Sequence, residues 1–221
     1  VQYHWAKGEY ETAIGYGQRC LETGARRDDL GLQVTGRYYL GGCHQARGEF
    51  PTALEHYRWI VDALSGGRES ERFGLSGLPF SGACALAAAC LVELGDAGPA
   101  QDLLRRGEAA GSVANHLYSK VPLAVARGRL LMLYGETAEV VRVMEPIVAI
   151  CREHNFVGQT MRALTVLGDA YAAAGRASEA VPLVQEAIQL QESAAAFVDR
   201  ALWVRTLGEA YRQAGQLGEA E

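Results

Sequence analysis

The most constraining feature of this sequence is a glycine that returns at a nearly fixed interval. Glycines that open a Gly-x-x-x-x-Ala pattern, once with Val in place of Ala, stand at positions 8, 48, 95, 135, 175 and 215, so the successive steps are 40, 47, 40, 40 and 40 residues. Self-similarity at a period of this length is the signature of a repeat architecture. The chain is therefore expected to stack copies of one small unit instead of folding around a single central core.

The residues around these glycines indicate that each unit is a pair of helices. A glycine supplies the left-handed residue that ends one helix, and the short polar stretch after it caps the next. Pro51 and Pro99 fall in the first turn of the following helix, where a missing N–H costs little. Apolar residues such as Ala180, Val184 and Ala187 recur at helical spacing, and no segment alternates with period two over the length of a strand. The sequence predicts an all-α fold.

The repeat register places every helix. The predicted first helices are 28–47, 79–94, 114–134, 155–174 and 197–214, and the second helices are 10–23, 50–64, 97–110, 137–153 and 177–194. We divide residues 1–221 into a partial repeat 1–27, full repeats 28–64, 79–113, 114–154 and 155–195, and a partial repeat 196–221. The Gly/Ser-rich stretch 65–78 holds the seven extra residues and is expected to be a surface excursion. Both ends of the sequence are expected to cut a repeat.

Composition and charge narrow the class of protein. Apolar residues make up 49% and charged residues 21%, which is enough to bury a core, and the formal net charge of −5 argues against a nucleic-acid partner. Five cysteines at scattered spacings, without a CxxC pair, are interpreted as buried apolar residues in a reducing, cytoplasmic compartment. No apolar run approaches the roughly 18 residues of a membrane span, and no signal-peptide pattern opens the sequence, so no membrane partner is expected.

Two near-copies carry a family resemblance. Residues 167–171 read Leu-Gly-Asp-Ala-Tyr and residues 207–211 read Leu-Gly-Glu-Ala-Tyr, and the Gly-x-x-x-x-Ala pattern follows each of them. Over the whole chain these marks resemble the tetratricopeptide repeat, although the 40-residue step is longer than the family's 34. The resemblance implies a right-handed superhelical solenoid of helix–turn–helix repeats.

A narrower resemblance covers residues 71–221. The segments ERFGLSGLP (71–79), CLVELG (90–95) and PLVQEA (182–187) are similar to the C-terminal repeat region of large bacterial signalling ATPases. In those proteins a nucleoside-triphosphatase domain, often preceded by an adenylate or guanylate cyclase domain, lies upstream of the repeats. The resemblance implies a regulatory or sensor array. The phosphate-loop pattern Gly-x-x-x-x-Gly-Lys-Ser/Thr does not occur in these residues, so neither activity is carried over, and no cofactor is expected.

Stacked first helices of such an array line a groove in which partners usually bind. Projecting the register gives nine groove-facing candidates: Tyr38, Gln45, Arg129, Met132, Arg162, Asp169, Arg205, Glu209 and Arg212. The middle of the predicted groove is apolar and its C-terminal end is rich in arginine, which suits a peptide or helix with an apolar centre and an acidic end. The alternative is that these arginines pair with Asp169 and Glu209 on their own surface, at little net energy.

These observations predict a binding module and not an enzyme. No nucleophile–base pair, metal cluster or phosphate loop is recognisable in the sequence. The leading hypothesis is a scaffold that recognises a protein, a peptide or a neighbouring domain of its own chain in order to regulate it. The alternative is a sensor that holds a small-molecule effector in the repeat groove. Uncapped repeats at the ends would also favour self-association.

Overall fold

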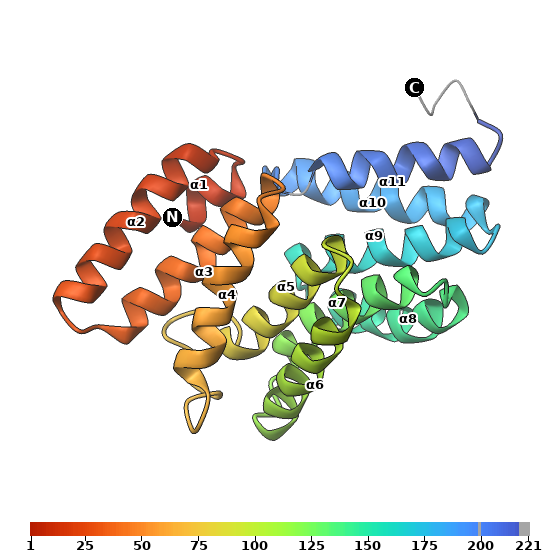
Figure 1. Cartoon of the computed structure of the whole chain (residues 1–221). Coiled ribbons are helices and arrows are strands. Elements are labelled where there is room, and N and C mark those ends of the chain that lie inside the picture. The colour runs from red at the N-terminus through yellow and green to blue at the C-terminus, as the bar shows by residue number, and fades with distance from the viewer. Residues whose placement is uncertain (199, 217–221) are drawn as a thin grey trace. The chain divides into compact units, whose positions relative to one another are not determined.

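Helices make up all the regular secondary structure in the residues that the computed structural model describes, 1–198 and 200–216 (Figure 1). The predicted first helices are α3 (Leu30–Ala46), α5 (Pro79–Glu93), α7 (Leu117–Leu133), α9 (Val157–Ala173) and α11 (Arg200–Gln213). The predicted second helices are α2 (Tyr10–Arg26), α4 (Phe50–Leu64), α6 (Ala97–Val113), α8 (Thr137–Glu153) and α10 (Ala177–Ala194). A short helix, α1 (Gln2–Ala6), precedes them within the predicted partial repeat 1–27. The all-α expectation is confirmed.

The recurring glycines adopt the backbone conformation that the turn requires. Their φ angles lie between 73° and 78° at all six positions. At Gly175, the glycine N–H donates to the Ala172 carbonyl at 2.9 Å, and the next N–H donates to the Tyr171 carbonyl at 2.8 Å. An added Cβ at Gly175 would have no atom within 4 Å. The requirement for glycine at this turn is therefore conformational and not steric.

A second left-handed residue recurs at the other turn of the repeat. Asp28, Asn115, Asn155 and Ala195 have φ angles of 51°, 47°, 53° and 48°. Aspartate and asparagine tolerate this conformation better than most residues with a side chain, whereas alanine does not share that advantage. Because this turn takes up a few residues, the first helices that follow it begin slightly later than the sequence predicted.

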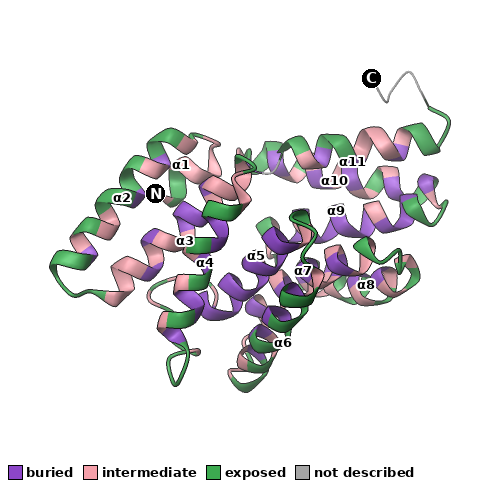
Figure 2. Ribbon diagram, in the orientation of Figure 1, coloured by how far each residue is buried: buried purple, intermediate pink, exposed green. Residues whose placement is uncertain are grey.

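The chain forms two compact units, residues 1–126 (unit 1) and residues 127–221 (unit 2). In unit 1, α3 packs against α2, α4 and α5, and α5 packs against α4 and α6. In unit 2, α9 packs against α8, α10 and α11. Figure 2 shows that α5 and α9 are the most buried helices of their units, while α2 and α8 expose one face.

Each unit contains the same close contact between a first and a second helix. A Cβ added to Gly41 would lie 2.6 Å from the Tyr57 ring, and a Cβ added to Gly168 would lie 2.5 Å from Cγ2 of Val184. Gly41 and Gly168 occupy the same repeat position, as do Tyr57 and Val184. Steric exclusion thus explains the glycine at these two positions, because an added methyl group would push the paired helices apart.

The predicted surface excursion at 65–78 contains no helix and is held by its own hydrogen bonds. The Glu69 carboxylate accepts from the N–H groups of Gly66 and Gly67 at 2.7 and 2.9 Å. The Arg72 guanidinium donates to the Leu75 carbonyl at 3.1 and 3.2 Å. These local bonds give the insertion a defined shape.

The five cysteines are free thiols, and all except the half-buried Cys20 are buried. Burial raises the pKa of Cys84 to about 12, so at neutral pH this sulfur remains a thiol. The prediction that the cysteines act mainly as small apolar residues is confirmed for the buried four.

Candidate partner-binding face

Seven of the nine predicted groove residues lie in unit 2, on the last turns of α7 and on α9 and α11. Arg129 and Met132 are on α7, Arg162 and Asp169 are on α9, and Arg205, Glu209 and Arg212 are on α11. Positions 129, 169 and 209 are separated by one repeat each, so they share one register. The same position holds Gly42 and Ala89 in unit 1. Unit 2 therefore replaces small residues with charged ones at this point of the repeat.

Asp169 is the centre of the electrostatics on this face. Burial is the main effect on this carboxyl and raises its pKa above the ordinary value. The Thr206 hydroxyl and the guanidinium groups of Arg205 and Arg129 act in the opposite direction, because they favour the charged form. Three successive first helices thus contribute to one partly desolvated charge cluster. We refer to Arg129, Asp169, Arg205, Glu209 and Arg212 as the charged face.

Glu209 lies in a more exposed environment and behaves differently from Asp169. Arg212 donates to its two carboxylate oxygens at 2.8 and 2.5 Å, and Gln213 donates to one of them at 2.7 Å. These hydrogen bonds lower the pKa of Glu209 to about 2. The alternative that the predicted arginines pair on their own surface is confirmed for Arg212. Arg205 is exposed and approaches both carboxylates only through longer-range attraction.

Arg162 and Met132 lie away from this centre. Arg162 is half-buried two helical turns before Asp169 on α9, and Met132 is half-buried near the end of α7. A partner-binding role for these two residues stays a prediction.

Tyr38 and Gln45, the two candidates in unit 1, meet around a buried tyrosine. The Tyr57 hydroxyl donates to Oε1 of Gln45 at 3.0 Å, and the rings of Tyr38 and Tyr57 lie 6.5 Å apart in an edge-to-face arrangement. Tyr38 also fills the space above Gly82, since a Cβ there would be 2.9 Å from its hydroxyl oxygen. Packing against neighbouring helices thus accounts for much of both side chains, and binding through them stays a prediction.

Sequence reasoning missed Thr206, which is fully buried on α11, donates its hydroxyl proton to the Leu202 carbonyl at 3.1 Å and also acts on the Asp169 carboxyl. The signal was present in the repeat register, because Thr206 takes the position that Val166 holds one repeat earlier. A hydroxyl at a position that is otherwise apolar is a mark of a buried polar neighbour.

Two other kinds of feature are absent from the part of the chain that the structure describes. No group of three or more His, Cys, Asp or Glu side chains with metal-binding geometry occurs among residues 1–198 and 200–216. None of the helices described there combines the length and the apolar character needed to cross a membrane.

The fold is shared with helical repeat proteins of known structure. The crystal structure of BtubC (BKLC) from P. vanneervenii superimposes with a TM-score of 0.60 at 16% identity, covering 96% of this chain and 86% of that one. Two crystal structures of a Podospora anserina putative kinesin light chain with nearly identical TPR-like repeats, one of them a point variant, give a TM-score of 0.53 at 22% identity, covering 85% of this chain and 89% of theirs. No family model matches the sequence, and no curated protein matches it significantly. The chain is an all-helical array of tetratricopeptide-like repeats.

Proposed function

We propose that this repeat array is a protein-interaction scaffold and that the charged face of unit 2 receives an acidic segment of its partner. The observation that carries the proposal is that Arg129, Asp169 and Glu209 occupy one repeat position at which unit 1 has Gly42 and Ala89, with Arg205 and Arg212 beside Glu209 on α11. Charged residues that share one register on successive first helices follow the line along which such scaffolds bind extended or helical segments.

The net charge of the charged face indicates the sign of the charge expected on the partner segment. The charged face combines three arginines with two carboxylates, so it carries one net positive charge within a chain whose net charge is −5. Arg212 is engaged by Glu209, whereas Arg205 is exposed and makes no short ion pair that the structure describes. An exposed guanidinium group without a short ion pair is a natural hydrogen-bond donor for a carboxylate, because its planar fork matches the two carboxylate oxygens.

The test is a set of labelled peptides with one apolar helical centre and an end of four Glu, four Gln or four Lys residues. We expect the Glu peptide to bind tightest in fluorescence anisotropy and its affinity to fall as salt is raised. The Arg129→Gln, Arg205→Gln double variant should bind the three peptides equally.

The matched control is the Arg19→Gln, Arg58→Gln double variant, which removes two arginines outside the charged face and should keep the preference for the Glu peptide. Equal binding of the three peptides by the unaltered chain, or no binding at all, would contradict the proposed partner chemistry.

We further propose that the array, read as one solenoid over residues 1–221, regulates a nucleoside-triphosphatase or cyclase domain of a larger bacterial signalling protein in the cytoplasm. The sequence resemblance of residues 71–221 and the free, mostly buried thiols support this context. The measurement is the nucleotide hydrolysis or cyclase rate of the parent polypeptide with and without these repeats. Identical rates in the two proteins, at every partner concentration, would sink the regulatory part of the proposal.

A further inference from the structure

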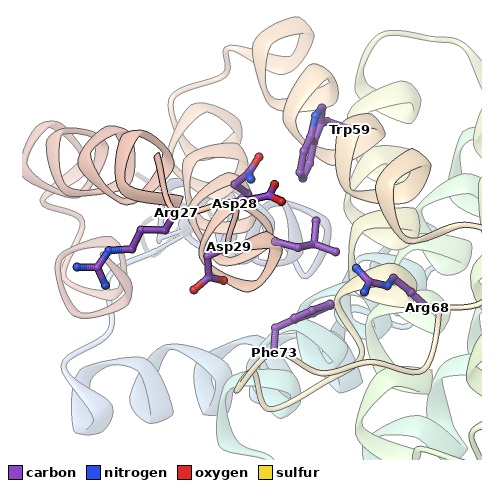
Figure 3. Close-up of a pocket in the computed structure, with 8 residues that line it drawn as sticks. Arg27, Asp28, Asp29, Trp59, Arg68 and Phe73 are labelled. Atoms are coloured by element: carbon purple, nitrogen blue, oxygen red, sulfur yellow. The ribbon is translucent and has the colours of Figure 1, made fainter. Parts of the chain in front are cut away.

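A pocket of about 770 Å³ lies in unit 1. Its wall is formed by the turn before α3, by α3 and α4, and by the insertion 65–78 (Figure 3). The residues that carry its chemistry are Asp28, Leu30, Gln33, Trp59, Arg68 and Phe73. Its volume falls within the range of roughly 300–1,000 Å³ that is common for small-molecule sites. None of these residues was among the predicted groove positions.

Trp59 is the larger aromatic side chain in the lining and contacts a neighbouring arginine. The guanidinium carbon of Arg37 lies 4.3 Å from the centre of the Trp59 ring, which is a close cation–π contact. Arg37 is half-buried, and its Nε is buried without a hydrogen-bond partner in the described structure. The Trp59 ring is therefore an important contact of the Arg37 guanidinium group. Trp59 thus contacts Arg37 and also lines the pocket.

Phe73 forms the opposite wall and is fixed by an unusual backbone. Its φ angle is 49°, and that of the following Gly74 is 78°. A left-handed conformation at a bulky residue is strained by about 1–3 kcal/mol and is characteristic of ligand clamps. The ring lies over Gly31, where an added Cβ would be 3.2 Å from the Phe73 ring. The insertion thus places an aromatic side chain, half-buried, at the rim of the pocket.

Two opposite charges face this aromatic slot from different sides. In Figure 3 the Asp28 carboxylate lies near Trp59, and the Arg68 guanidinium points toward the slot beside Phe73. Asp28 is exposed, and the described structure gives its carboxylate neither an ion pair nor a hydrogen bond; Arg68 contacts Glu71 alone, at 3.3 Å. The other two charges of the lining are less available. Asp29 accepts the Leu32 N–H at 3.0 Å, and Arg27 points away from Trp59 (Figure 3).

We propose that this pocket binds a small zwitterion with an apolar or aromatic body, the chemistry of a free amino acid. The ammonium end pairs with Asp28, the carboxylate pairs with Arg68, and the body lies against Trp59, Leu30 and Phe73. A purely cationic ligand brings no negative charge to pair with Arg68. A purely anionic ligand brings no positive charge to pair with Asp28. The Gln33 amide offers both a donor and an acceptor within the same lining.

The test compares ligands that share one body and differ in charge. L-tryptophan, tryptamine and indole-3-propionate form one set, and L-leucine, isopentylamine and 4-methylpentanoate form a second set for a smaller body. By isothermal titration calorimetry on the full chain, we expect the amino acid to bind at least five-fold more tightly than either relative in one or both sets. The proposal is overturned if neither amino acid binds below 10 mM or if a singly charged relative binds as tightly.

Two substitutions test which residue binds each charged end of the ligand. Asp28→Asn should make the amino acid bind no better than its deaminated acid, and Arg68→Gln should make it bind no better than its decarboxylated amine. Asparagine tolerates the positive φ of residue 28, so this variant is expected to fold normally. The matched controls are Asp62→Asn and Arg58→Gln, which alter exposed residues of α4 outside the pocket. Unchanged selectivity in both pocket variants, or the same loss in the controls, would overturn the assignment.

Discussion

Units 1 and 2 are built from the same repeat, yet they bury titratable groups of opposite kinds. In unit 1, the His56 imidazole stacks on His44 with 5.6 Å between ring centres, and burial, His44 and Arg37 lower its pKa to about 4. In unit 2, burial raises the pKa of the Asp169 carboxyl. Both units keep the same glycine turn and the same close helix contact. The comparison teaches that the turns and small residues fix the backbone, while other helix positions are free to carry chemistry.

The largest expected effect tests what the two units share. Gly41→Ala and Gly168→Ala each place a methyl group less than 3 Å from a side chain of the partner helix. We expect each to lower the free energy of unfolding by about 1–3 kcal/mol, because a packed contact is overfilled. Urea unfolding measures the loss. Hydrogen exchange should place it in α3 and α4 for Gly41→Ala and in α9 and α10 for Gly168→Ala.

Gly158→Ala is the control for this comparison. Gly158 also lies in α9, but an added Cβ has no atom within 4 Å, so the substitution should stabilise by about 0.5–1 kcal/mol through helix propensity. If Gly168→Ala were as stabilising as Gly158→Ala, the close contact would not be the reason for glycine at the repeat position.

The next prediction concerns a difference between the units, namely how their stability depends on pH. The sign of this dependence follows from proton binding by the folded and unfolded states. The folded chain protonates His56 only near pH 4, whereas the unfolded chain does so near 6.5. The unfolded state therefore binds more protons between these values, and stability in unit 1 falls as pH drops through this window. From pH 7 to pH 5 we expect a loss of about 1–2 kcal/mol. His56→Phe keeps an aromatic ring on His44 and should remove this loss in urea titrations at the two pH values.

Asp169 gives unit 2 the opposite tendency. Because its folded pKa is raised, the folded state retains the proton more readily than the unfolded state, and stability from this group rises as pH falls through the raised pKa. Hydrogen exchange at pH 7 and pH 5 should show weakened protection in α3 and α4 and not in α9. Equal weakening in the two units, or a pH dependence untouched by His56→Phe, would refute the comparison.

The smallest expected effect concerns the second turn, where the last described repeat departs from the others. Unit 1 uses Asp28 and Asn115 at this turn, and unit 2 uses Asn155 and then Ala195, at φ angles of 53° and 48°. Ala195→Gly should stabilise the fold by about 1 kcal/mol, because it relieves the left-handed strain of alanine. Thermal unfolding measures the gain. Ala194→Gly, one residue earlier and still helical, should instead destabilise by about 1 kcal/mol. A loss in both variants would argue against strain at residue 195.

The sequence was a good guide to features that depend on the backbone. The 40-residue step located α2 to α11, and the turn glycines predicted the left-handed positions, because glycine is required there by conformation alone. The Asp/Asn turn was missed, although Asn115 and Asn155 are also one repeat apart. Their signal is weaker because these residues are common in many other loops.

The candidate sites were less predictable. The register brought Arg129, Asp169 and Glu209 to one position, since periodic residues on stacked helices must share a face. It did not reveal that Asp169 is desolvated, which depends on how α9 and α11 pack. The pocket was not predictable at all, because it depends on the path of the insertion, and Phe73 in a Gly/Ser-rich stretch has no periodic partner.

The positive φ angles of the turn glycines have a consequence for chemical synthesis. Gly48, Gly95, Gly135, Gly175 and Gly215 all have positive φ angles. A positive φ is the ordinary preference of a residue of the opposite chirality. A synthetic chain carrying D-alanine at these turns would keep the native backbone and lose the extra freedom that glycine gives the unfolded chain. Each 40-residue repeat thus has one backbone position, the turn glycine, whose conformation suits a D-amino acid.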